Sequence, residues 1–173
     1  MQQTALITGA TSGIGEALAK EASRQGHQVI ACGRNTAQLK ALETLYNMQT
    51  LQFDVSDQEA TKTVMENVEC DIVVLNAGTC EYVDIEEIDI GLFKRVFDVN
   101  FFGTINVLSA ILPNLKKDNK IVFIDSMARL LPFTKSEAYG ASKAALHYAS
   151  KSFAVDLHGR GIKVQSISPG FVE

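Results

Sequence analysis

TALITGATSGIG, residues 4–15, is the stretch that decides the fold of this 173-residue chain. Its first five residues form an apolar run that is typical of a short buried strand. After the glycines, apolar residues recur at helical spacing to about Gln25. A strand, a glycine-rich loop and a helix start in this order point backbone N–H groups and the positive end of a helix dipole at a phosphate. The stretch therefore predicts a nucleotide-binding unit, in preference to a plain Gly-rich turn, with a ligand-facing loop made of Gly9, Thr11, Ser12, Gly13, Ile14 and Gly15.

The rest of the chain alternates between short apolar runs and helical patterns. An almost wholly apolar strand is typical of a parallel sheet that is covered on both faces. The alternation predicts one α/β domain over residues 1–173, a doubly wound parallel sheet of the Rossmann type with helices on both faces. Further strands are expected at 28–32, 50–53, 71–75, 120–124 and 162–168, and helices at 36–46, 59–68, 84–102, 103–117 and 139–158.

Composition excludes several classes of protein. Hydrophobic residues make up 46% of the chain and charged residues 21%, as in an ordinary globular domain. With a net charge of −4, we expect neither nucleic acid nor a membrane surface as a partner. No apolar run is long enough to span a bilayer, and residues 1–4 lead into the first strand without a signal-peptide pattern. Cys32, Cys70 and Cys80 lack metal-ligand spacing, which favours reduced thiols in a cytoplasmic protein without a metal.

Polar or small residues follow several of the expected strands, at the edge where such sheets bind ligands. Asp54 follows the third strand, where the boundary of the next helix is its alternative role. Asn76, Ala77 and Gly78 follow the fourth strand; small residues there let a cofactor pass closely, and Asn76 can tie neighbouring strands together. Ser126 follows the fifth strand, where a plain turn residue is the alternative. Their shared place at one edge favours a nucleotide-dependent enzyme.

The end of the second strand bears on the choice of cofactor. In dinucleotide-binding folds this strand end faces the adenosine ribose, and an acidic residue there bonds the 2′-hydroxyl. This chain instead has Gly33 followed by Arg34. A guanidinium suits a phosphate through charge-assisted hydrogen bonds. The sequence therefore favours NADP(H) over NAD(H), with a solvated loop arginine as the alternative.

Asn100 is a polar amide among apolar residues of a helical pattern. A buried polar group of this kind needs a hydrogen-bond partner. Two explanations remain open: Asn100 bonds locally at a helix kink, or it holds a buried water.

Tyr139 and Lys143 are four residues apart in a helical pattern, so their side chains share one face of the helix. A phenol alone titrates near ~10 and is protonated at neutral pH. An ammonium about 4 Å away, at an effective dielectric near 20, contributes roughly 4 kcal/mol, which bounds the lowering of the phenol pKa at about three pH units. We expect this pair to perform general acid–base catalysis, although alone it would suit an ordinary helix surface.

Together these motifs resemble those of the short-chain dehydrogenase/reductase family. They occur in the family's order over the whole chain: TGxxxGxG at 8–15, Asp54-Val55, NAG at 76–78, Asn100, Ser126, YxxSK at 139–143 and Pro169-Gly170. The glycine loop resembles the short, single-domain branch of the family, and Gly33-Arg34 resembles its NADP-preferring members.

The resemblance implies a role for each matching residue. Tyr139 would be the catalytic acid–base, and Ser126 would hold the substrate oxygen and stabilise developing charge. Lys143 would lower the pKa of Tyr139 and bond the nicotinamide ribose, while Asn100 would hold a water that links Lys143 to solvent. The remaining cofactor contacts would come from Asp54 and Val55 at the adenine, and from Asn76, Ala77, Gly78, Pro169, Gly170 and Val172 along the cofactor.

The expected function is an NADP(H)-dependent oxidoreductase that interconverts a ketone or aldehyde and an alcohol by hydride transfer. A homodimer or tetramer through the helices at 103–117 and 139–158 is implied by the resemblance alone. Two alternatives remain: a nucleotide-binding regulatory or interaction module without turnover, and an epimerase or dehydratase of nucleotide sugars, which suits the glycine loop less well.

The sequence departs from the family in two places. Members of this branch are usually longer, so we expect a native chain that continues past Glu173 into a seventh strand and substrate-covering helices. Without them, the sheet would have a bare edge and the substrate pocket would be open on one side. Met127 and Arg129 stand beside Ser126 where small residues are frequent in the family, which bears on substrate preference.

Overall fold

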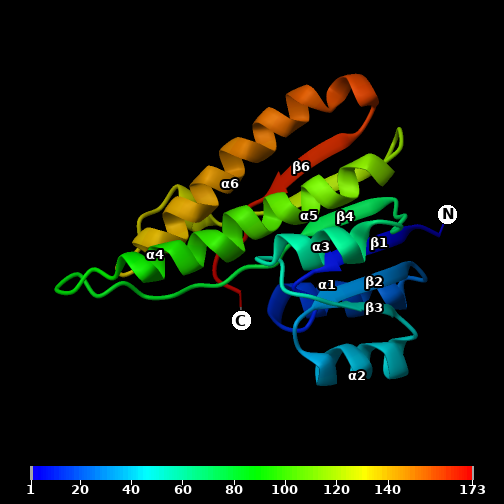
Figure 1. Cartoon of the computed structure of the whole chain (residues 1–173), viewed down its shortest axis with the longest axis horizontal. Helices are drawn as coiled ribbons and strands as arrows, with labels where there is room; N and C mark the ends of the chain where they lie inside the picture. The colour runs from blue at the N-terminus through cyan, green and yellow to red at the C-terminus, as the bar shows by residue number, and fades with distance from the viewer. Residues whose placement is uncertain (1, 173) are drawn as a thin grey trace.

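The computed structural model describes residues 2–172, and they form one six-stranded sheet in which every neighbouring pair of strands is parallel (Figure 1). The order across the sheet is β3-β2-β1-β4-β5-β6. This is the doubly wound topology that the alternating pattern predicts. Glu173, the end of the Pro-Gly motif, lies outside the described residues. The strands are β1 (Thr4–Thr8), β2 (Gln28–Gly33), β3 (Gln49–Gln52), β4 (Ile72–Leu75), β5 (Lys120–Ile124) and β6 (Lys163–Ile167).

Helices cover both faces of the sheet, each over its own apolar core. The alternation of side chains along β1 shows the two faces: Ala5 and Ile7 join one core, and Leu6 joins the other. The first core is completed by α1 (Gly13–Arg24) and α2 (Thr36–Tyr46). The second is completed by α3 (Gln58–Met65), α5 (Gly103–Ile111) and α6 (Glu137–Asp156). The two-faced cover of the sheet is therefore confirmed.

One long helical segment, drawn in green in Figure 1, packs against one face of the sheet. It joins α4 (Ile90–Phe97), a π-helical turn (Asp98–Phe102) and α5. The expected start at residue 84 is wrong, because the Asp89 side chain accepts from Gly91 N at 2.7 Å and caps the helix there. The expected end at residue 117 is also late, because α5 passes into a 3₁₀ turn at Leu112–Asn114 that contains a proline.

Within residues 2–172, the helix Ile90–Asn114 has the length and apolar composition of a membrane span. Its inward residues Val107, Leu108 and Ile111 are each at most 2% exposed and belong to the core beneath the sheet. The core position of these residues accounts for part of the apolar composition of the helix.

Candidate active site

The strand order has a switch point beside β1, and a crevice is expected there. From β1 the chain moves to β2 and β3 on one side, and then returns to β4 on the other. Ligands of doubly wound sheets bind at this switch point, outside the carboxyl ends of the strands. A cavity of about 220 Å³ lies at this edge. It is lined by the expected site residues Ile14, Asn76, Gly78, Ser126, Tyr139, Lys143, Pro169 and Gly170, and also by Thr79, Cys80, Ile124 and Asp125.

The glycine loop leaves room that side chains would fill. Gly9 and Gly13 have φ of +66° and +53°, a left-handed conformation that favours glycine. A Cβ on Gly15 would lie 2.3 Å from the carbonyl oxygen of Gly9, so the helix can approach the loop only with glycine there. Nothing lies within 4 Å of the Cβ position of Gly13, at the start of α1. These features fit the pyrophosphate of a dinucleotide, since the loop is open at a helix N-terminus.

Asn76 links the end of β4 to β1, which is one of the roles expected for it. Its Nδ2 donates to the carbonyl oxygen of Thr8 at 2.9 Å. The Thr8 hydroxyl in turn accepts from the backbone N–H groups of Asn76 and Ala77, each at 3.0 Å. These bonds hold the segment after β4 against the glycine loop.

Asn100 is fully buried in the π-helical turn between α4 and α5. Its Oδ1 accepts from Thr79 N at 2.7 Å, while its Nδ2 donates to Thr79 O and to the Ser142 hydroxyl, each at 2.9 Å. Asn100 lies at a helix irregularity, as the first of the two explanations expected, but its side chain bonds to residues 21 and 42 positions away and not locally. The amide thereby fastens the segment after β4 to the helix that carries Lys143. A water held by Asn100 stays a prediction.

Ser126, Tyr139 and Lys143 all line the cavity. Ser126 follows β5, and its hydroxyl accepts from Ala128 N at 3.1 Å, which fixes the turn. The Nζ of Lys143 lies 5.8 Å from the centroid of the Tyr139 ring and donates to Ile124 O at 2.8 Å. The four-residue spacing therefore places both side chains at one site, as expected.

The pKa of Tyr139 is shifted in the direction opposite to the expectation. Burial raises the pKa of Tyr139, and the charges of Cys80 and Asp125 raise it further, while the Ser126 hydroxyl acts in the opposite direction. The pKa of Lys143 falls to about 8 because the side chain is only 3% exposed. The expected lowering of the Tyr139 pKa is thus not found in this chain, because desolvation outweighs the opposing effect of the Ser126 hydroxyl.

The residues expected at the adenosine end lie outside this cavity. The Nη1 of Arg34 forms an ion pair with Asp54 Oδ2 at 3.1 Å, and the Arg34 side chain is 71% exposed. Hydrogen bonds from Ser56 and Arg34 outweigh burial and lower the pKa of Asp54. The Val55 side chain packs against Gly103, where a Cβ would lie 2.6 Å from its Cγ2. Val172 is exposed and does not line the cavity.

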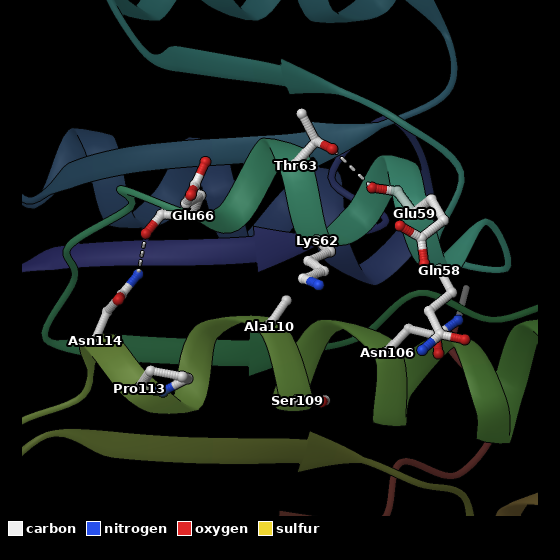
Figure 2. A pocket seen from close by; sticks show the side chains of 10 residues that line it. All are labelled: Gln58, Glu59, Lys62, Thr63, Glu66, Asn106, Ser109, Ala110, Pro113 and Asn114. Carbon is white, nitrogen blue, oxygen red and sulfur yellow. Dashed lines mark hydrogen bonds between the residues drawn. The ribbon is translucent and has the colours of Figure 1, made fainter.

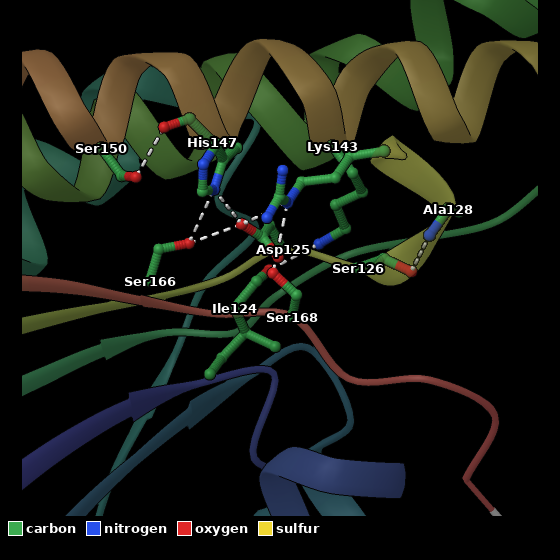
Figure 3. Close-up of polar contacts among 10 residues, drawn as sticks. Ile124, Asp125, Ser126, Ala128, Lys143, His147, Ser150, Ser166 and Ser168 are labelled. Carbon is green, nitrogen blue, oxygen red and sulfur yellow. Dashed lines mark hydrogen bonds and ion pairs between the residues drawn. The ribbon is translucent and has the colours of Figure 1, made fainter. Parts of the chain in front are cut away.

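A buried polar cluster behind Ser126 was missed by the sequence analysis (Figure 3). Asp125 Oδ2 accepts from the Ser166 hydroxyl at 2.5 Å and lies 2.7 Å from His147 Nδ1. Arg129 Nε forms an ion pair with the same oxygen at 3.4 Å. The sequence signal was an acidic residue directly after the apolar strand at 120–124, and a histidine one helical turn after Lys143.

A larger cavity of about 520 Å³ lies between α3 and α5 (Figure 2). Its polar lining comes from the two helices, and in the described part of the chain it includes none of the expected site residues. The strand-end cavity, although smaller, is therefore the candidate active site.

Comparison with known proteins agrees with this geometry. The family model described as short chain dehydrogenase matches residues 3–173. The chain is 35% identical to a serine 3-dehydrogenase of Rhizobium radiobacter over 182 residues, covering 100% of this chain and 73% of that protein. It is 34% identical to an NADP-dependent 3-hydroxy acid dehydrogenase of Salmonella typhi over 177 residues, covering 96% and 71% of the two chains. A solved structure, the closed form of a serine dehydrogenase complexed with NADP+, superposes with a TM-score of 0.93 at 30% identity, covering 98% of this chain and 73% of that one.

The doubly wound sheet and the cavity at its strand ends define a Rossmann-type protein with a ligand site at the switch point. The chain belongs to the short-chain dehydrogenase/reductase family, whose relatives named above act on CH–OH groups.

Proposed function

We propose that this chain is an NADP(H)-dependent oxidoreductase that interconverts a carbonyl compound and an alcohol through a Ser126–Tyr139–Lys143 proton relay. The observation that supports the proposal most is the cavity in which these three side chains face Ile14 of the glycine loop. The nicotinamide supplies or accepts the hydride when it is bound.

Each side chain has one task in this relay. Tyr139 moves the proton to or from the substrate oxygen, because its titratable hydroxyl lines the cavity and interacts there with the Ser126 hydroxyl. Ser126 orients the substrate oxygen from a turn that is fixed by its own hydrogen bond to Ala128. Lys143 binds the ribose of the cofactor beside Gly78, where a Cβ would come within 3.3 Å of its Nζ. Asn100 holds the segment after β4 in place for this contact.

Replacing Tyr139 with Phe tests the relay. The variant should bind NADPH normally and lose turnover by roughly a hundredfold to ten-thousandfold, the usual range for removal of a general acid–base. Tyr148→Phe is the matched control, because Tyr148 lies on the same helix and is 79% exposed. Full turnover by the Tyr139→Phe variant would refute the relay.

We propose that Arg34 selects NADP(H) by binding the 2′-phosphate. Its guanidinium lies just after β2 and close to Asp54, at the strand end that faces the adenosine ribose in this fold. The NADP-dependent relative and the NADP+ complex of a structural neighbour support this assignment by similarity.

The Arg34→Ala variant tests cofactor selection. It should weaken NADPH binding by about 1.5–3 kcal/mol and leave NADH binding nearly unchanged, because the lost hydrogen bonds are charged and only NADPH carries the phosphate. Lys40→Ala is the matched control: its side chain is also 71% exposed and forms an ion pair, with Glu43, on α2. Equal losses for both cofactors, measured by fluorescence titration, would refute the role of Arg34.

Serine and short 3-hydroxy acids are the first substrates to screen, since the relatives are named for them. The alternative function is a cofactor-binding module without turnover. NADPH binding without oxidation or reduction of any such substrate, or of simple ketones and aldehydes, would favour that alternative.

A further inference from the structure

We propose that Asp125 is a positioning residue for the redox reaction: its buried carboxylate, fixed by three other elements, sets the place and the charge environment of the Lys143 ammonium. The consequence for turnover rests on the proposed function, whereas the effect on Lys143 does not.

The geometry places Asp125 directly behind the reactive groups. It lies between Ile124, whose carbonyl oxygen binds Lys143 Nζ at 2.8 Å, and Ser126. Its backbone N–H donates to Ile167 O at 2.9 Å, so the pairing of β5 with β6 continues to this residue. A shift of Asp125 would therefore move both the carbonyl that holds Lys143 and the Ser126 hydroxyl.

The Asp125 side chain is locked by three elements (Figure 3). Ser166 on β6, His147 on α6 and Arg129 in the turn after β5 all contact Oδ2, and the side chain is fully buried. Its Oδ1 is also buried and has no hydrogen-bond partner within the described residues. A carboxylate with one unpaired buried oxygen is costly, because a buried polar group loses its water without replacement.

The charge of Asp125 acts on the catalytic pair. Burial lowers the pKa of Lys143, and the Asp125 carboxylate is the charge that opposes this effect. The same carboxylate raises the pKa of Tyr139. Without Asp125, both groups would lose protons at lower pH, and Lys143 would be neutral over more of the physiological range.

Other titratable groups surround this pair and enter the pH dependence. Tyr139 and His147 lie one turn on either side of Lys143 on α6. Arg129 faces Asp125 from the turn after β5, and Cys80 lines the cavity from the segment after β4. Arg129 provides a charge of opposite sign to Asp125, so the two residues allow a paired test.

The experiment follows the titration of Lys143 by NMR of the whole chain with lysine labelled at Cε, and Lys143→Met assigns the signal. In Asp125→Asn the midpoint should move to lower pH than in wild type, because the opposing carboxylate is gone. In Arg129→Gln it should move to higher pH, because a neighbouring cation is gone. Arg129 contacts Asp125 at the longer distance of 3.4 Å, so this variant remains informative if Asp125→Asn does not fold.

Opposite movements of the two midpoints would support the proposal. An unchanged midpoint in a folded variant, or movement of both midpoints in the same direction, would overturn it. Loosened packing would move the Lys143 midpoint in the same direction in both variants. Ser166→Ala removes a hydrogen bond to Asp125 but keeps the charge, and its Lys143 midpoint should stay at the wild-type value.

Turnover provides the second readout. In Asp125→Asn the alkaline limb of kcat/KM for carbonyl reduction should move with the Lys143 midpoint, and a movement of one pH unit changes the rate on that limb about tenfold. Midpoints that move as expected in a protein without turnover would uphold the role of Asp125 and refute the proposed function. A limb that stays in place while the midpoint moves would refute the effect of Asp125 on catalysis.

Discussion

The two ends of the crevice are built in different ways. At the β4–β5 end, Lys143 and Asn100 are buried and are held by hydrogen bonds from several elements. At the β2–β3 end, Arg34 is 71% exposed and pairs with the half-exposed Asp54. The first end is assembled by the folding of the chain itself, whereas the second is a solvated ion pair of the kind that contributes little to stability.

The buried end is suited to proton transfer, and the exposed end is suited to cofactor selection. Proton transfer requires groups at fixed distances and with defined pKa values, so these groups are buried at a cost in stability. Cofactor selection requires only that a phosphate gains or loses a charged partner, and an exposed side chain can provide this. Changes at the buried end should therefore alter stability as well as activity, and changes at the exposed end should alter binding alone.

The largest pH dependence of stability is expected at Lys143. Its pKa is about 8 in the folded chain and 10.5 ordinarily, so the charged form costs roughly 3 kcal/mol of folding free energy below pH 8. Because the unfolded chain holds the proton more tightly, the wild-type stability should rise between pH 8 and 10.5. Lys143→Met lacks this cost but also loses the hydrogen bond to Ile124. We therefore expect it to be more stable than wild type by about 2 kcal/mol at pH 7.

Urea unfolding of both proteins at pH 7 and pH 10 measures this effect. The advantage of Lys143→Met should shrink at the higher pH, and Lys151→Met, an exposed position on the same helix, should show no such pH dependence. A constant difference at both pH values would show that Lys143 is not held in the charged form against burial.

The sequence predicted the fold well because that prediction depends on patterns along the chain. The apolar strands, the glycine loop and the Tyr139–Lys143 spacing all have local signatures, and the structure places the last two at one cavity. What it could not provide is the surroundings of each group. Burial of Tyr139 reversed the expected direction of its pKa, and Asp125 became important only through residues 22 and 41 positions away.

The second prediction concerns the contribution of Asn100 to the free energy of unfolding. Asn100→Ala removes three hydrogen bonds and leaves the backbone of Thr79 without its side-chain partner. We expect a loss of about 2–3 kcal/mol in the free energy of unfolding, because buried polar groups are left unpaired. Ser142→Ala removes only one of these bonds and should cost less. Equal stability of Asn100→Ala and wild type in urea would show that the amide does not fasten the segment after β4.

The smallest effect is expected at the exposed end, in Asp54→Asn. Asp54 holds Arg34 in the free chain and places a negative charge beside the guanidinium. Its removal should tighten NADPH binding relative to NADH by about 0.2–1 kcal/mol, the range of an exposed ion pair. The ratio of the two affinities is the quantity to measure, since any contact of Asp54 with the adenosine affects both cofactors alike. The gain should fade at high salt, because exposed charges are screened. An unchanged ratio at low salt would mean that the ion pair with Asp54 does not compete with the phosphate for Arg34.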